Sequence, residues 1–191
     1  MFEEGFPICL QDKLHTVLSR ISTKTYNNIS CGYTDIPNNE QFELLDGSMI
    51  QFPYRIYFID DGLCDWLNGL EEKFIHHCIF TRSCNGYVRE KHLKAILEME
   101  YPEWCMPYIL KLSSEYVVEI LDVIYASMMN KDNLLFYAFC QNNPYLMKYY
   151  YSRMISYWNE YNRSQWPNYH DYVGYKLYTE CFGYMKDNGK I

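Results

Sequence analysis

Apolar residues recur at helical spacing along most of this chain, and from Asp60 onward the pattern is helical throughout. One face of a helix carries apolar residues at positions i, i+3, i+4, i+7 and i+11, and this spacing is seen in Val117, Ile120, Leu121, Ile124 and Met128. The same kind of spacing, with prolines or capping residues near several starts, predicts helices over residues 10–22, 69–82, 86–97, 102–112, 132–142, 144–162 and 168–186. The helix with the five residues above is capped by Ser113-Ser114-Glu115 and ends near residue 129. Because short connections join the helices from residue 69 onward, we expect neighbouring helices to pack antiparallel.

A different pattern follows the first predicted helix. Residues 23–40 are polar and rich in Asn, Gly and Pro, as is typical of a connection with turns. Within residues 42–58, Asp46-Gly47 lies between two apolar stretches, which is a hairpin signal. Pro53 cannot donate a ladder hydrogen bond, so it restricts the second arm to an edge or an extended segment. We therefore expect a small N-terminal hairpin or extended strap laid on the helices.

The segment 86–97 gives the clearest local signal in the chain. Asn85 offers a side-chain oxygen to the free amides of a helix start, and Gly86 permits a tight turn into the helix. Apolar residues and His92 line one face at helical spacing. We expect the opposite, solvated face to carry the charged residues Arg89, Glu90, Lys91 and Lys94.

The run Asn85-Gly86-Tyr87-Val88-Arg89 resembles the start of the second helix of a HEAT-type repeat, where a turn residue precedes Val-Arg. Tyr116-Val117 repeats Tyr87-Val88 after 29 residues, although Val118 or Glu119 stands where the arginine would be. The resemblance covers residues 69–129 and implies a mostly α fold of antiparallel helix pairs, stacked as a short HEAT-like solenoid. A generic helical bundle is the alternative. Either fold gives a single domain over 1–191, with a helix plus strap in 1–60 and the helical region in 61–191.

Composition narrows the possible functions. The net charge of −7 disfavours a nucleic-acid partner, because phosphate binding relies on Lys and Arg. The same charge suits a basic protein partner, and solubility explains it equally well. The first residues are acidic where a signal peptide would be basic, and no apolar run is long enough to span a membrane. The eight cysteines are scattered singly, so we expect reduced cysteines and a cytoplasmic location.

Residue types that bind metals are present, but their spacing does not favour a metal site. His76 and His77 are adjacent on a helix, so we expect their side chains to point about 100° apart and not to share one metal. Asp60 and Asp61, with Asp65, could hold a divalent cation, but the preferred interpretation is that one of them ends the strap and caps the next segment. The spacing of four zinc-type residues matches no known finger or ribbon: His77, Cys78, Cys84 and His92. We expect no metal or cofactor.

The strongest functional signal is the concentration of aromatic residues in 149–175. Tyrosine, tryptophan and arginine are enriched at protein interfaces, although an aromatic seam between the last two helices would give the same pattern. Both interpretations stay open. The candidate binding residues are Tyr150, Arg153, Tyr157, Trp158, Tyr161, Trp166 and Tyr169.

These observations predict a non-catalytic protein-binding chain of the cytosol, either a scaffold or an inhibitor. Small acidic immunity proteins that neutralise basic toxins are one analogy for such an inhibitor. The alternative is a nucleic-acid-processing or nucleic-acid-binding protein on a HEAT-like scaffold, with an acid such as Asp60 or Asp61 facing a positive groove. A third hypothesis is a regulatory domain that binds a small ligand among the tyrosines.

Overall fold

The fold is mostly α-helical, as the sequence predicts, with one two-stranded antiparallel sheet among the residues described. The structure is a computed structural model and describes residues 2–21, 32–37, 40–62, 67–129 and 131–184. It divides into two compact units, Met1–Tyr108 and Ile109–Ile191, which we call the N-terminal and C-terminal units. Their boundary lies within helix α4 (Met106–Leu112). The single-domain organisation stays a prediction.

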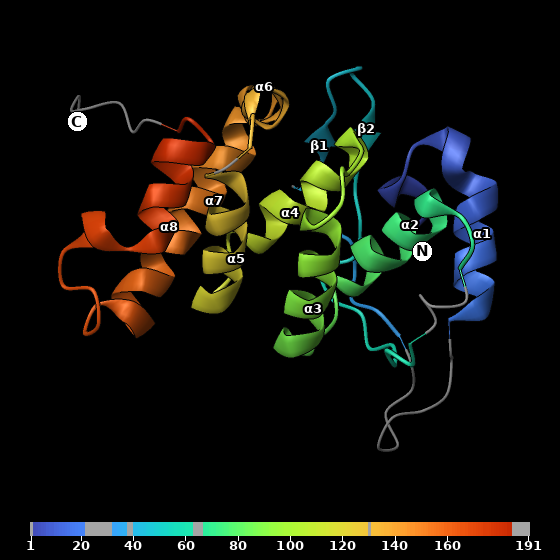
Figure 1. Ribbon diagram of the computed structural model, residues 1–191, viewed down its shortest axis with the longest axis horizontal. Coiled ribbons are helices and arrows are strands. Elements are labelled where there is room, and N and C mark those ends of the chain that lie inside the picture. The colour runs from blue at the N-terminus through green and yellow to red at the C-terminus, as the bar shows by residue number, and fades with distance from the viewer. Residues whose placement is uncertain (1, 22–31, 38–39, 63–66, 130, 185–191) are drawn as a thin grey trace. The chain divides into compact units, whose positions relative to one another are not determined.

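Three helices form the main body of the N-terminal unit: α1 (Gln11–Arg20), α2 (Leu70–Phe80) and α3 (Gly86–Leu97). Helix α2 lies between the other two and packs against both (Figure 1). Because α2 has neighbours on two sides, seven consecutive residues from Phe74 to Phe80 are buried. The unit also contains the short 3₁₀ turns Glu3–Gly5, Ile8–Leu10 and Glu103–Cys105.

The predicted hairpin is present as β1 (Phe42–Glu43) and β2 (Met49–Ile50), with Phe42 opposite Ile50. Gly47 turns the chain at φ 82°, a conformation that glycine adopts without strain. Phe52 follows β2 and stacks on Phe42 and on Tyr108, with ring centroids 5.2 and 4.0 Å apart. This aromatic stack holds the hairpin on the helices. The polar connection predicted for 23–40 falls largely outside the described residues.

The turn between α2 and α3 corrects one prediction. The Asn85 side chain accepts a hydrogen bond from the Tyr87 amide at 3.0 Å, so the predicted helix cap is confirmed. The prediction that Arg89 lies on the solvated face is wrong, because its side chain is 1% exposed. The Arg89 guanidinium donates to the carbonyl oxygens of Ser83 and Cys84, at 2.9 and 3.2 Å. Carbonyl groups beyond the end of a helix need donors, and Arg89 supplies them from inside the turn.

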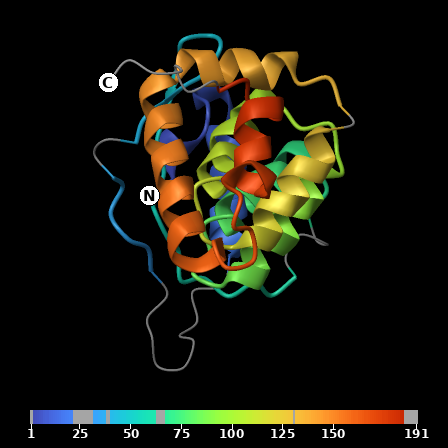
Figure 2. The ribbon, with the colours of Figure 1, turned by 90° about the vertical axis from the view of Figure 1, so that its left-hand side faces the viewer.

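The C-terminal unit contains α5 (Val118–Met128), α6 (Leu134–Asn142), α7 (Pro144–Tyr157) and α8 (Val173–Lys176). Helix α8 lies between α5 and α7 (Figure 2). Helix α7 continues as a π-helical turn over Trp158–Asn162, and α8 continues as another over Leu177–Cys181. The segment predicted as one helix over 168–186 is thus a 3₁₀ turn (Tyr169–Asp171), α8 and a π-helical turn.

Neighbouring helices do not always pack as the resemblance implies. Helices α2 and α3 form a close pair, whereas α5 packs mainly against α8, far along the chain. The HEAT-like repeat therefore stays a prediction. No helix among the described residues combines the length and the apolar character needed to cross a membrane.

Candidate functional site

Three tyrosines form an exposed aromatic cluster on the C-terminal unit. Tyr116 precedes α5, Tyr157 ends α7, and Tyr161 lies in the π-helical turn after α7. Their ring centroids are 6.0 to 6.2 Å apart, within the range of favourable aromatic pairs. Tyr116 is 56% exposed and Tyr161 is 62% exposed, so solvent reaches much of both residues. We call these three residues the tyrosine cluster.

An arginine on α7 fixes one side of this cluster. Residues 149, 153 and 157 occur at intervals of four, which places their side chains on one helix face. Arg153 donates hydrogen bonds to the hydroxyl oxygens of Tyr149 and Tyr157, at 3.2 and 3.1 Å. Its guanidinium also lies 5.7 Å from each ring centroid, close enough for a cation–π interaction. These contacts hold the Tyr157 side chain in one orientation.

The structure separates the other predicted binding residues from this surface. Tyr150 is wholly buried, with the Lys111 ammonium 4.9 Å from its ring centroid. The indole nitrogen of Trp158 donates to the carbonyl oxygen of Trp166 at 2.9 Å, and the Tyr169 ring packs 4.8 Å from that of Trp158. These contacts between half-buried residues join the end of α7 to the segment after it. The predicted set therefore contains both surface and internal aromatic residues.

Sequence reasoning did not include Tyr116 among the binding residues. In the sequence, Tyr116 stands out only because it lies 29 residues after Tyr87, a spacing that was part of the HEAT-type resemblance. It reaches the cluster because the start of α5 lies beside the end of α7, which is a tertiary contact. Neither helical periodicity nor composition carries a signal for that contact.

The net negative charge of the chain comes from one of the two units. Residues 1–108 contain nine Lys and Arg against 16 Asp and Glu, whereas residues 109–191 contain eight of each. The formal charge of −7 therefore arises entirely in the N-terminal unit. The unit that bears the tyrosine cluster is neutral by this count.

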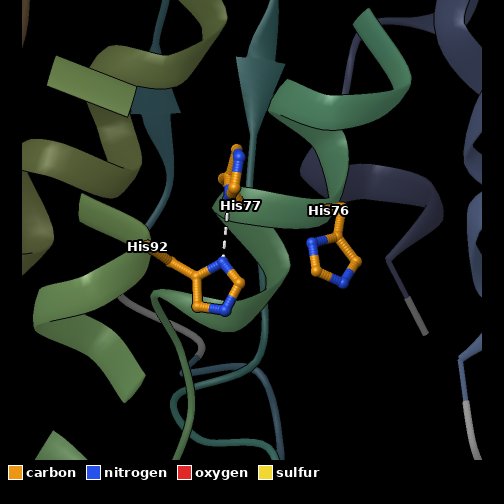
Figure 3. Close-up of side chains that lie close together, drawn as sticks. All are labelled: His76, His77 and His92. Carbon is orange, nitrogen blue, oxygen red and sulfur yellow. Dashed lines mark hydrogen bonds between the residues drawn. The ribbon is translucent and has the colours of Figure 1, made fainter. Parts of the chain in front are cut away.

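A second cluster lies inside the N-terminal unit, where three histidine rings meet (Figure 3). His76 and His77 come from α2, and His92 comes from α3. The Nδ1 atoms of His77 and His92 are 2.8 Å apart, and one ring nitrogen of each histidine lies within 4.8 Å of the other two. The expectation that His76 and His77 do not share one metal stays a prediction, although a ring nitrogen of each lies within 4.8 Å of the other. The His92 ring lies 5.0 to 5.2 Å from both, so α3 supplies the group that joins them.

Burial keeps the His76 and His77 rings uncharged. Desolvation lowers the pKa of His76 to about 3 and that of His77 to about 4, so both imidazoles are neutral at pH 7. Both ring nitrogens of His76 are buried and lack a hydrogen-bond partner among the described residues. Leaving a buried polar atom unpaired costs roughly 1–3 kcal/mol. The arrangement is therefore destabilising unless a further group binds there.

Asp60 borders the histidine cluster on its outer side. One carboxylate oxygen, Oδ2, lies 3.2 Å from Nε2 of His92 and 2.7 Å from the ammonium of Lys91. The contact with His92 is the main reason that the pKa of Asp60 is held well below its usual range. The preferred interpretation of Asp60 as a residue that ends the strap overlooked this contact. Asp65 lies outside the described residues.

The cysteines of the predicted zinc-type group do not join the histidines. The Cys78 thiol donates instead to the sulfur of Cys105 at 3.6 Å, and Cys84 is exposed. All six cysteines in the described part of the chain are free, and Cys31 and Cys64 lie outside it. A metal ion bound at the histidine cluster would therefore be coordinated by imidazole nitrogens and not by these thiols.

The tyrosine cluster and the histidine cluster are the two features of this chain from which a function can be proposed. The chain has no significant match to any protein-family model, curated protein or solved structure.

Proposed function

We propose that this chain is a non-catalytic protein-binding protein of the cytosol and that the tyrosine cluster is its binding surface. The observation that carries the proposal is the exposure of Tyr116 and Tyr161 beside an arginine-anchored Tyr157. Tyrosine and arginine are the side chains that most often dominate binding energy at protein interfaces. Each ring offers a large apolar area, and its hydroxyl can bond to a partner. The free cysteines support a reducing, cytosolic location.

Pre-organisation supports the same proposal. A side chain that is already held in one rotamer loses less conformational entropy on binding. Arg153 holds Tyr157 through a hydrogen bond, and Tyr161 stacks on Tyr157 with an interplanar angle of 29°. The surface therefore keeps its shape without a partner, as a rigid anchor does.

The partner we propose is a basic protein. The net charge of −7 attracts a positively charged partner, and salt screens this attraction beyond a Debye length of about 8 Å at physiological ionic strength. Such attraction raises the rate of association more than it raises the final affinity. An inhibitor that must capture a basic toxin quickly would benefit from this faster association. An immunity-type protein is therefore one form of the proposal.

Nucleic acid is the competing partner class. Aromatic side chains beside arginine can stack on the bases of single strands. Single-strand binding also requires a positively charged groove, and the unit that bears the tyrosine cluster has no excess of Lys and Arg. The charge distribution therefore favours a protein, and a nucleic acid is an outcome that the experiment must distinguish.

The proposal is tested by capture from a lysate of the source organism with and without nuclease, followed by binding measurements with each purified partner. We expect one basic protein to bind stoichiometrically and Tyr161→Ala to weaken its affinity at least tenfold, equivalent to about 1.4 kcal/mol. Tyr145→Ala is the matched control, because Tyr145 lies on α7 and is 63% exposed, as Tyr161 is 62% exposed. The association rate should fall as salt increases.

Two results would overturn the proposal. Equal affinities for the Tyr161→Ala and Tyr145→Ala variants would remove the tyrosine cluster as the binding surface. Loss of all capture after nuclease treatment would favour the nucleic-acid alternative instead.

A further inference from the structure

We propose that His76, His77 and His92 bind a single Zn²⁺ ion inside the N-terminal unit, with Asp60 orienting His92. This site is separate from the tyrosine cluster and does not depend on the proposed function. Three nitrogen ligands from two adjacent helices converge there, with donor atoms within 4.8 Å of one another. Both nitrogens of the wholly buried His76 lack a partner among the described residues, so this ring has bonding capacity that a cation would use.

Asp60 sets the tautomer that metal binding needs. A carboxylate beside Nε2 of His92 favours a proton on that nitrogen, because the carboxylate is an acceptor. The lone pair of His92 is then on Nδ1 and accepts a hydrogen bond from Nδ1–H of His77 at 2.8 Å. An ion bound between the two rings would replace that proton, which would move to Nε2 of His77 or to solvent. Histidines that bind metals typically donate their second nitrogen to a carboxylate, which fixes the ring and raises its basicity, and Asp60 lies close enough to His92 to take that role.

The donor set selects the class of ion. Neutral imidazoles suit Zn²⁺ and the neighbouring transition metals, whereas Mg²⁺ and Ca²⁺ prefer oxygen ligands. Zinc binds histidine nitrogen at about 2.0–2.1 Å, so two ligands of a tetrahedral ion lie about 3.4 Å apart. Ring rotations would have to widen the 2.8 Å contact between His77 and His92 and draw His76 inward. The fourth ligand must be small, such as water, because all three rings are at least 92% buried.

This burial indicates what the ion would do. A substrate could not reach a centre enclosed in this way, so we assign the ion to structure and not to catalysis. It would cross-link α2 to α3 and would stabilise the folded N-terminal unit by binding only that state.

The test uses the full chain, stripped of metal with a chelator and titrated with zinc chloride. We expect one Zn²⁺ per chain and a melting temperature that rises with each tenfold increase in free Zn²⁺. Cobalt(II) should give the visible d–d absorption of a four-coordinate nitrogen site, without a thiolate charge-transfer band. This spectrum is recorded on the unmodified chain, so it remains informative if a variant fails to fold.

Two variants and a matched control locate the ion. His76→Phe keeps a buried ring against Phe80, whose centroid lies 4.6 Å away, and removes one ligand. We expect it to weaken Zn²⁺ binding at least 100-fold, whereas Asp60→Asn should weaken binding about 10- to 100-fold. His15→Gln should change nothing, because His15 is exposed on α1. The proposal fails if the stripped chain takes up no Zn²⁺ at micromolar concentration, if cobalt shows thiolate ligation, or if His15→Gln weakens binding as much as His76→Phe.

Discussion

A buried hydrogen bond between Tyr178 and Ser113 offers a quantitative test of the C-terminal core. The two hydroxyl oxygens are 2.8 Å apart, and both side chains are wholly buried. The Ser113 hydroxyl already donates to the carbonyl oxygen of Leu110 at 2.7 Å. Because a serine hydroxyl has one proton, Tyr178 must be the donor in the second bond. Removing each partner should therefore have a different cost.

Tyr178→Phe removes only the donor and keeps the ring. Ser113 retains its bond to Leu110, so we expect a loss of about 1 kcal/mol in the free energy of unfolding. Ser113→Ala removes two bonds and leaves the Tyr178 hydroxyl buried without an acceptor. We expect that variant to lose about 3 kcal/mol, a typical bond plus the penalty for an unpaired donor. In the double variant nothing is left unpaired at Tyr178, so the combined loss should be about 2 kcal/mol smaller than the sum of the single losses.

Urea unfolding monitored by tryptophan fluorescence measures these losses, because Trp158 and Trp166 lie in the same unit as both substitutions. Tyr125→Phe is the matched control. It removes a tyrosine hydroxyl that donates to Glu180 at 2.6 Å in an exposed position, and should cost no more than about 0.5 kcal/mol. Additive single and double losses would refute the inferred bond between Tyr178 and Ser113, as would equal losses for Tyr178→Phe and Tyr125→Phe.

Two further predictions concern backbone conformation and thiol exposure. Gly183 has φ 64°, and a β-carbon there would lie 1.9 Å from the Tyr137 ring, whereas Gly47 has φ 82° and open space around it. Gly47→Ala should cost about 1–2 kcal/mol from strain alone, and Gly183→Ala should cost at least about 1 kcal/mol more by urea unfolding. Adding Tyr137→Ala should remove that excess, and persistence of the excess would contradict the steric explanation. Brief alkylation of the native chain, read by peptide mass spectrometry, should modify the exposed Cys9 and Cys84 first. Burial raises the pKa of Cys181 to about 11, and so reduces the reactive thiolate at pH 8. If Cys181 were alkylated as fast as Cys84, the Cys181 thiol could not be buried as the structure shows.

Much of the local structure could be predicted from the sequence. The helix predicted at 86–97 has those boundaries in the structure, and the hairpin forms around Asp46-Gly47 as expected. Both depend on neighbouring residues, namely an asparagine cap and a glycine that accepts positive φ. The predicted helix at 168–186 is less regular, because a 3₁₀ turn and a π-helical turn flank a short α8. Helical periodicity does not distinguish these hydrogen-bonding patterns from one another.

The sequence by itself determined where most of the helices lie, because the 3.6-residue spacing of apolar residues is a property of the chain alone. Tertiary structure alone decided which surfaces meet. It brought His92 of α3 to the two histidines of α2 and placed Tyr116 beside Tyr161. Those outcomes depend on contacts between residues that are distant in sequence, and local spacing carries no information about such contacts.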